Sequence, residues 1–146
     1  MNDKKKEFCV RSECHLSKAL EIIGDRWSLL ILRDLMFTEK RSYSELQSAE
    51  EKIATNILAS RLNDMVTNGI VTKTVDATDR RKVLYHLTEK GIDLLPVILE
   101  LMDWMQKYDM SGKNALDRSD DKVGDKNEIL EEYRIKLRKE HLQDLE

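Results

Sequence analysis

The chain has 146 residues, of which 36% are charged and 5% aromatic, and its formal net charge is −3 at pH 7. This length suits one modest domain with an extension, and the scarcity of proline and glycine favours helix over sheet. The sequence has no apolar run long enough to span a membrane, and no apolar segment follows its basic start. We therefore expect neither a membrane partner nor a secretory signal, and we expect a cytoplasmic location.

The first half of the chain predicts four helices, because apolar side chains recur there every three or four positions. The helices are expected over residues 16–24, 26–37, 42–49 and 54–69. Asp25 is a suitable N-cap for the second helix, and Gly69 follows Asn68 where a left-handed residue ends the fourth. The second helix is apolar on most sides, so it should lie at the centre of the fold.

The second half predicts a β-hairpin and a long helix. Residues 70–77 and 82–88 are rich in β-branched side chains and read as two strands joined by a short turn. A helix over residues 89–108 is expected to bend at Pro96, because proline removes one backbone hydrogen bond.

These patterns divide the chain into four parts. We expect a flexible segment over residues 1–13, one domain over 14–108, a linker over 109–126 and a helical extension over 127–146. The extension carries an apolar stripe, which suggests that it packs across a partner subunit or covers a dimer surface. Charge differs between the parts: residues 25–91 contain 11 Lys and Arg against 10 Asp and Glu, so this region tolerates a polyanion despite the overall negative charge.

The order of these elements describes a winged helix-turn-helix, mainly α with a small two-stranded β-wing. In this fold the later helix of the tandem pair enters the major groove, and the hairpin reaches phosphates or the minor groove beside it. Three cations, Arg80, Arg81 and Lys82, follow one another at the hairpin turn. Such a positive tip neutralises phosphates locally and releases counterions, whatever the net charge of the protein.

Short polar side chains near the start of the fourth helix suit contacts to base edges or phosphates. We expect Thr55, Asn56 and Ser60 in this role, together with Ser44 from the preceding helix. Thr55 could also cap the helix, so that the free amides at its end face a phosphate.

Each feature alone has an ordinary structural explanation. A cationic turn is more often a solvated loop, and Thr55 and Asn56 alone are more often simple helix-start residues. Arg61 could reach a phosphate or a guanine edge, or it could pair with Asp64 or Glu45 within the chain. The interpretation depends on the joint pattern at the correct spacing.

Four blocks in chain order resemble the HxlR-type transcriptional regulators, relatives of the MarR group. The blocks, within residues 14–106, are "CHLSKALEIIGDRWSLLILRDLMF", "RSYSELQ", "KIATNILASRLNDMVTNGIVTKTV" and "RRKVLYHLTEKGIDLLPVILELMDW". The resemblance implies a homodimeric winged helix-turn-helix DNA binder that represses or activates nearby genes. By position, it implies that Thr55 to Arg61 form the recognition helix and that Arg80 to Lys82 form the wing. The chain departs from the family at Cys14-His15, where a Cys-Pro pair is usual, and in its long tail.

The two cysteines, Cys9 and Cys14, are spaced C-x4-C. A disulfide scaffold is not expected in a cytoplasmic chain of this composition, and with His15 the pair lacks a recognised zinc spacing, so we expect no metal and no cofactor. Cys14 lies at or near the start of the first helix, where free amides favour a thiolate. Members of the resembling family sense oxidants or electrophiles with this cysteine, so Cys14 is a redox-sensing candidate. An inert thiol near the dimer contact is the equal alternative.

The sequence therefore predicts a dimeric transcriptional regulator that binds specific DNA. Dimerisation should use the apolar stripes of the first helix and the long helix, and two-fold symmetry then predicts a pseudo-palindromic operator with half-sites about one helical turn apart. The alternative is an adaptor that uses the same fold to bind a protein. An enzyme is not expected, because His15, His86 and His141 lie on separate elements without catalytic partners.

Overall fold

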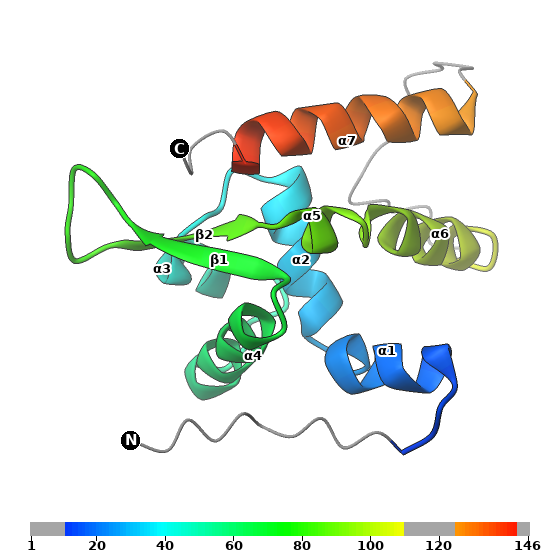
Figure 1. The fold of residues 1–146 in the computed structure, drawn as a ribbon, viewed down its shortest axis with the longest axis horizontal. Coiled ribbons are helices and arrows are strands. Elements are labelled where there is room, and N and C mark those ends of the chain that lie inside the picture. Colours follow the sequence, from blue (N-terminus) through cyan, green and yellow to red (C-terminus); the bar gives the residue numbers. More distant parts are fainter. Residues whose placement is uncertain (1–10, 110–124, 143–146) are drawn as a thin grey trace.

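A computed structural model describes residues 11–109 and 125–142 of the chain (Figure 1). Its elements are helices α1 (His15–Ile23), α2 (Ser28–Phe37), α3 (Tyr43–Gln47) and α4 (Thr55–Thr67), strands β1 (Val71–Val75) and β2 (Val83–Leu87), and helices α5 (Glu89–Ile92), α6 (Leu95–Gln106) and α7 (Lys126–Leu142). The mainly α fold with a two-stranded wing is therefore confirmed. Most of the expected N-terminal segment and linker falls outside the described residues. None of the helices in the described ranges has the length and apolar character needed to cross a bilayer.

Local sequence determines several helix ends. Ser42 and Glu45 form a capping box at the start of α3, in which each side chain accepts a hydrogen bond from the backbone of the other. The N-cap position of α2 is Trp27 and not Asp25 as predicted, but the Asp25 carboxylate still accepts from the backbone amides of Trp27 and Ser28, at 2.8 and 3.0 Å, just before the helix. After α4, Gly69 has a φ of 69°, a left-handed conformation that suits glycine and turns the chain into β1.

Two other expectations about helix ends are wrong. Ala54, with an extended backbone, occupies the N-cap position of α4, and Thr55 is already helical, so Thr55 does not cap this helix. The long helix expected over residues 89–108 is two helices, α5 and α6, with Asp93 and Leu94 between them. Pro96 lies in the first turn of α6, where no intrahelical hydrogen bond is lost, and so it begins a helix instead of bending one.

The core lies where α2, α4, α6 and the hairpin meet. Its leucine and isoleucine side chains with no exposed surface are Leu32, Leu35, Leu58, Leu87, Ile92, Leu95 and Leu137. Helix α2 contributes several of the buried side chains, which confirms its predicted central position. Leu137 belongs to α7, and α7 packs against β2, α5 and α6 of its own chain. The sequence predicts that the apolar stripe of α7 packs across a partner subunit or covers a dimer surface. The buried face of α7 instead completes the core of its own subunit, so that expectation is wrong for this face.

The two strands pair antiparallel, with a register from Val71 opposite Leu87 to Val75 opposite Val83. Helices α4 and α7 lie on opposite sides of this hairpin, and the hairpin loop projects away from the helices (Figure 1). The edge of β2 that faces away from β1 is covered at the middle of the strand, because the backbone amide of Tyr85 donates to the carbonyl of Arg41 at 2.8 Å. The link between α2 and α3 thus holds the wing from the side opposite β1.

Candidate nucleic-acid interface

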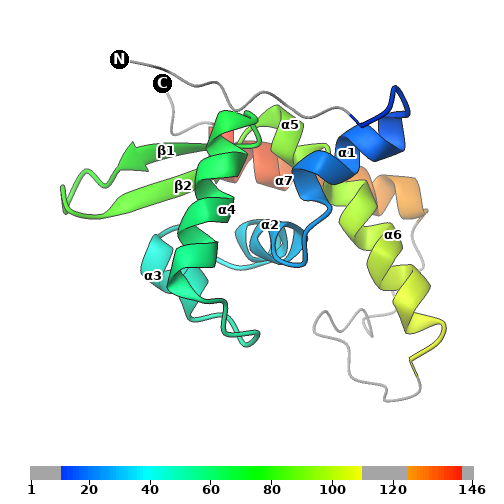
Figure 2. The same ribbon diagram turned by 90° about the horizontal axis from the view of Figure 1, so that it is seen from below.

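Helix α4 and the loop of the hairpin lie at the same end of the molecule, and α6 extends toward the other end (Figures 1 and 2). A tight turn sets this relationship, since the backbone amide of Ile70 donates to the carbonyl of Met65 at 2.9 Å. The Thr88 hydroxyl donates to the carbonyl of Gly69 at 2.6 Å, and the Lys90 ammonium donates to that of Asn68 at 2.8 Å. The end of α4 is therefore fastened to the end of β2.

The short polar residues predicted to contact DNA are exposed. Thr55, Asn56 and Ser60 are exposed on α4, and Ser44 is exposed on α3. The Tyr43 hydroxyl donates to the carbonyl of Thr55 at 2.6 Å, so the start of α4 is anchored to α3. This bond holds the two helices of the tandem pair together and leaves the polar side chains at the start of α4 free to meet a ligand.

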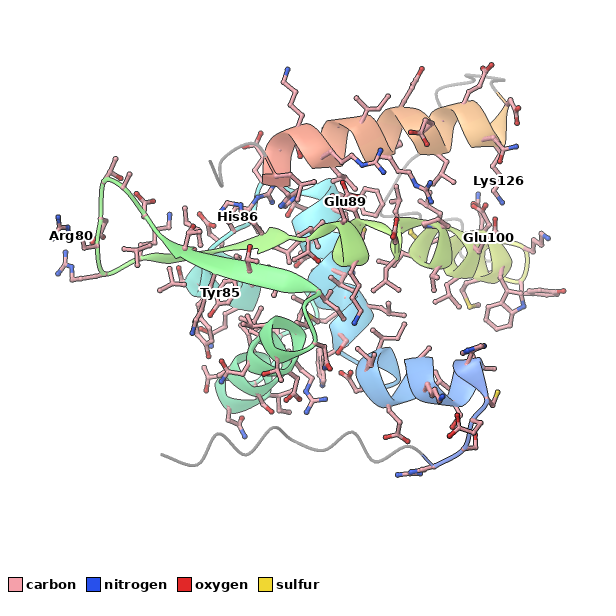
Figure 3. The ribbon with its side chains drawn as sticks, viewed as in Figure 1. Arg80, Tyr85, His86, Glu89, Glu100 and Lys126 are labelled. Atoms are coloured by element: carbon pink, nitrogen blue, oxygen red, sulfur yellow. The ribbon has the colours of Figure 1, made fainter. Side chains whose placement is uncertain are left out.

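The wing loop is ordered by its own aspartate. The Asp76 carboxylate accepts from the backbone amide and the hydroxyl of Thr78, both at 2.7 Å, and these bonds lower the pKa of Asp76. Arg80 lies at the extreme end of the hairpin (Figure 3) and is exposed. Arg81 is also exposed, and its Nε is 3.4 Å from a carboxylate oxygen of Asp79. The loop thus presents two arginine side chains to solvent.

The side chain of Lys82 lies apart from the two arginines at the tip of the wing and faces α3. Its ammonium lies 3.5 Å from Oε1 of Glu45 at the start of α3, so it ties the base of the wing to the helix-turn-helix. Backbone hydrogen bonds from Arg41 and Ser42, with a smaller contribution from Lys82, lower the pKa of Glu45 to about 2. The continuous run of three cations in the sequence becomes a pair at the tip and one cation turned inward, because only Lys82 has an acidic neighbour across the fold.

Of the two acidic partners considered for Arg61 in the sequence, Asp64 and Glu45, the structure pairs it with Asp64 and adds Asp25. Its guanidinium lies 3.1 Å from Asp64 and 3.7 Å from Asp25, whereas Glu45 binds Lys82. Burial alone would raise the pKa of Asp25, but hydrogen bonds from the Ser28 side chain and from backbone amides lower it overall. Two carboxylates therefore hold Arg61 in the protein without DNA.

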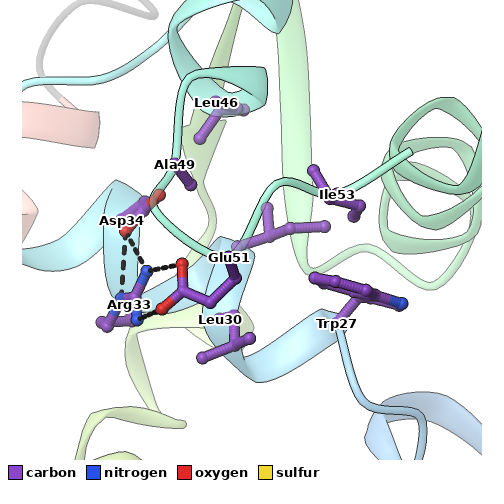
Figure 4. Close-up of a pocket in the computed structure, with 9 residues that line it drawn as sticks. Trp27, Leu30, Arg33, Asp34, Leu46, Ala49, Glu51 and Ile53 are labelled. Carbon is purple, nitrogen blue, oxygen red and sulfur yellow. Dashed lines mark hydrogen bonds and ion pairs between the residues drawn. The ribbon is translucent and has the colours of Figure 1, made fainter. Parts of the chain in front are cut away.

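An ion-pair cluster that sequence reasoning missed supports the turn between α3 and α4 (Figure 4). The Arg33 guanidinium donates to both carboxylate oxygens of Glu51, at 2.5 and 3.0 Å, and to Asp34 at 2.8 and 3.0 Å. The hydrogen bond from Arg33 lowers the pKa of Glu51 to about 2. Glu51 precedes Lys52, whose φ of 52° is left-handed, so the clamp holds the chain next to its most constrained turn residue. The hollow beside the cluster has a volume of about 10 Å³, too small for a ligand larger than one water.

Cys14 occupies the N-cap position of α1, and its side chain is exposed. Its carbonyl accepts from the backbone amide of Lys18 at 3.0 Å, and its own amide donates to the Ser12 hydroxyl at 3.3 Å. Cys9, the other cysteine of the C-x4-C pair, lies outside the described residues. Within the described ranges, no group of three or more candidate metal ligands occurs.

A second exposed surface lies on α1 and α6, which neighbour each other in both views, away from the wing (Figures 1 and 2). Its large apolar side chains are Leu16, Leu20, Val97, Leu101, Trp104, Met105 and Tyr108. Trp104 and Tyr108 are 60% and 68% exposed, which is unusual for aromatic residues of a small domain. This apolar face is called the α1–α6 surface below.

The fold and the exposed N-terminal start of α4 define a winged helix-turn-helix DNA-binding protein. Residues 22–113 match the model of the HxlR-like helix-turn-helix family, so the chain belongs to that family of transcriptional regulators, which are not enzymes. It is similar to the HTH-type transcriptional regulator YdeP of Bacillus subtilis, with 35% identity over 65% of this chain and 73% of YdeP.

Solved structures agree with this assignment. The crystal structure of PA1607 matches with a TM-score of 0.67 and 28% identity, over 79% of this chain and 80% of that one. The reduced form of the transcriptional regulator YodB from B. subtilis matches with a TM-score of 0.55 and 33% identity, over 70% of this chain and 100% of that one. Helix α7 begins beyond the residues that the family model matches.

Proposed function

We propose that the protein regulates transcription as a homodimer that binds a pseudo-palindromic operator in double-stranded DNA. The observation that carries this proposal is that the start of α4 has exposed polar side chains and the wing loop has two exposed arginines. Helix α4 and the wing loop lie at the same end of the molecule (Figure 1). A helix of this width fits the major groove, and a cationic hairpin beside it reaches the adjoining backbone.

The proposed contacts divide by chemistry. Asn56 is suited to read a base edge, because an amide can both donate and accept, whereas Thr55, Ser60 and Ser44 suit phosphates or single base contacts. Arg80 and Arg81 would neutralise phosphates, since both are exposed at the tip. Arg61 and Lys82 would add contacts only by exchanging their present carboxylate partners for phosphates.

The α1–α6 surface is the proposed dimer interface. An apolar face with two exposed aromatic side chains is costly in water, and a second copy of the same face would cover it. The surface lies away from the wing, so two copies joined there would keep both α4 helices free (Figure 2). Two-fold symmetry would then place the half-sites about one helical turn apart.

Cys14 is the proposed sensor of oxidants or electrophiles. Its exposed thiol at the start of α1 adjoins the proposed dimer interface, so a modification there could change how the subunits meet. The relative YodB has been solved in a reduced form, and this likeness supports a redox role for a cysteine of the present chain. In Cys14→Ser, DNA binding should no longer respond to a quinone or a peroxide, and an unchanged response would remove Cys14 from this role.

The test of the proposed function begins with selection of binding sequences from random duplex DNA. The recovered duplex, of about 30 base pairs, and a scrambled duplex are then titrated with the protein between about 50 and 200 mM salt. The proposal expects tighter binding to the selected duplex, a two-fold symmetric motif and a steep salt dependence. If the selection recovers no binding sequence, and binding to duplex DNA is undetectable or independent of salt, the proposed function is contradicted and a protein-binding adaptor is favoured.

A further inference from the structure

Helix α7 covers the outer edge of the wing strand. The backbone amides of alternate residues of β2 face away from β1, and those of Tyr85 and Leu87 are both satisfied by other elements. Tyr85 donates to the carbonyl of Arg41, and Leu87 donates to Nδ1 of His141 in α7 at 3.1 Å. An open strand edge exposes unpaired backbone groups and is free to move, so these two bonds fix the edge in place.

His141 joins two elements through both of its ring nitrogens. Nδ1 accepts from Leu87 of β2, and the hydrogen on Nε2 is donated to the carbonyl of Leu35 in α2 at 3.0 Å. This requires the neutral imidazole with its proton on Nε2. The ring has no exposed surface, and it packs edge-on against the ring of His86 with centroids 6.1 Å apart. A fully buried polar side chain that uses its donor and its acceptor on different elements sets the distance between them.

Further contacts along α7 act on the same neighbours. Glu140 lies 3.6 Å from Arg41, and the Arg41 guanidinium also donates to backbone carbonyls at the end of α2. Arg138 donates to the Glu89 carboxylate of α5 at 3.0 Å, close to where β2 ends (Figure 3). Near the middle of α7, the Tyr133 ring meets the Phe37 ring of α2 edge-on, with centroids 5.9 Å apart.

We propose that α7 is a brace for the wing and that His141 is its positioning residue for DNA binding. The brace holds β2 against the end of α2, and the buried side chains of α2 share one core with those of α3 and α4, so α7 fixes the wing arginines relative to α4. This inference rests on the proposed DNA binding, and it concerns a helix outside the residues that the family model matches.

The key variant is His141→Phe, which keeps a buried aromatic ring but removes both hydrogen bonds. His141→Gln retains one acceptor and one donor and should restore part of the effect. Ile135→Ala is the matched control, because Ile135 lies on the same helix, is 59% exposed and carries no charge. We expect His141→Phe to weaken binding of the operator duplex by about tenfold, and the control to leave it unchanged.

A double-mutant cycle separates bracing from general destabilisation. If α7 acts through the wing, His141→Phe should have little further effect in a protein that already carries Arg80→Ala and Arg81→Ala, because the wing contacts are gone. Hydrogen exchange without DNA should show faster exchange of the β1 and β2 amides in His141→Phe and unchanged exchange in α4.

The outcomes distinguish this inference from the proposed function. Failure of the unmutated protein to bind any duplex would contradict the DNA-binding function. The brace would still be tested in that case, because hydrogen exchange of the β1 and β2 amides is measured without DNA. Equal losses in the two backgrounds of the cycle, or unchanged exchange in the hairpin of a folded variant, would overturn the brace. If His141→Phe does not fold, His141→Gln is measured in the same cycle and is held to the same criteria.

Discussion

Lys82 at the base of the wing and Glu45 at the start of α3 form an ion pair, 3.5 Å from nitrogen to oxygen, between residues 37 positions apart. The same carboxylate closes the capping box with Ser42. One side chain therefore joins the start of α3 to the hairpin, and both elements border the proposed DNA face.

The first prediction concerns this ion pair. Glu45→Gln should strengthen binding to random duplex DNA, because Lys82 becomes free to meet a phosphate and glutamine can still accept in the capping box. Glu50→Gln is the control, since it removes the same charge from an exposed position nearby. Glu45→Gln should also lower the stability, because its carboxylate accepts from the backbone amides of Arg41 and Ser42 more strongly than a neutral amide oxygen does. Equal gains in affinity for the two variants would show that only net charge matters.

The second prediction separates the wing arginines from the rest of the interface. Arg80→Ala and Arg81→Ala should each weaken binding to all sequences and reduce the slope of log affinity against log salt by about one. Binding isotherms at several salt concentrations measure both effects. Lys139→Ala on α7 serves as a charge-matched control and should leave the slope unchanged. A slope that falls as much in the control as in the wing variants would exclude a phosphate role for the tip.

The third prediction concerns base reading by α4. Asn56→Ala should lower the preference for the selected operator over single-base variants by about 1–3 kcal/mol at one position of each half-site. The measurement is a set of competition titrations with every single-base substitution. Ser60→Ala should instead weaken all duplexes alike. An equal loss for Asn56→Ala on specific and random DNA would assign Asn56 to the phosphate contacts.

The fourth prediction concerns the α1–α6 surface. Trp104→Glu should convert the proposed homodimer to a monomer, because a charge would be buried at an apolar interface. Sedimentation of the purified protein gives the mass in solution. Ile135→Glu, at an equally exposed apolar site on α7, is the control and should remain dimeric. A dimer that survives Trp104→Glu would place the interface elsewhere.

The fifth prediction is a loss of stability in acid. Burial, with the nearby charge of Arg41, lowers the pKa of His141 from 6.5 to about 4. Between these values the unfolded chain binds a proton that the folded protein does not, so the free energy of unfolding should fall as the pH drops from 6.5 to 4, by roughly 3 kcal/mol at most. Below pH 4.5 the carboxyls of Glu45 and Glu51, each with a pKa of about 2, should add to the loss.

Urea unfolding at a series of pH values measures this dependence. In His141→Phe, or in His141→Gln if that variant is the one that folds, the segment between pH 6.5 and 4.5 should become flat. An unchanged slope in that segment would mean that another group titrates there.

Features that depend on neighbouring residues could be predicted from the sequence. The start of the third helix at about Ser42 and the left-handed Gly69 each follow from spacing within one turn of the chain. Thr55 failed as a cap because Thr, Ala and Asn are adjacent there, and local pattern cannot decide which of them is the first helical residue.

Features that join distant positions could not be predicted. Arg33 and Glu51 are 18 positions apart, and Leu87 and His141 are 54 apart, so only the folded chain shows that they meet. For the same reason, the run Arg80-Arg81-Lys82 gave no sign that its third member turns toward Glu45. Charge in a sequence indicates which residues can bind phosphate, and the fold decides which of them already have a partner.

The most direct test follows the backbone amides of isotope-labelled protein by NMR while the operator duplex is added. The account predicts that the amides from Thr55 to Arg61 and those of the wing loop shift together, at the same ratio of duplex to protein, while the α6 amides stay unperturbed. Shifts confined to α6, or shifts of the wing loop without α4, would contradict the claim that both elements contact one DNA duplex.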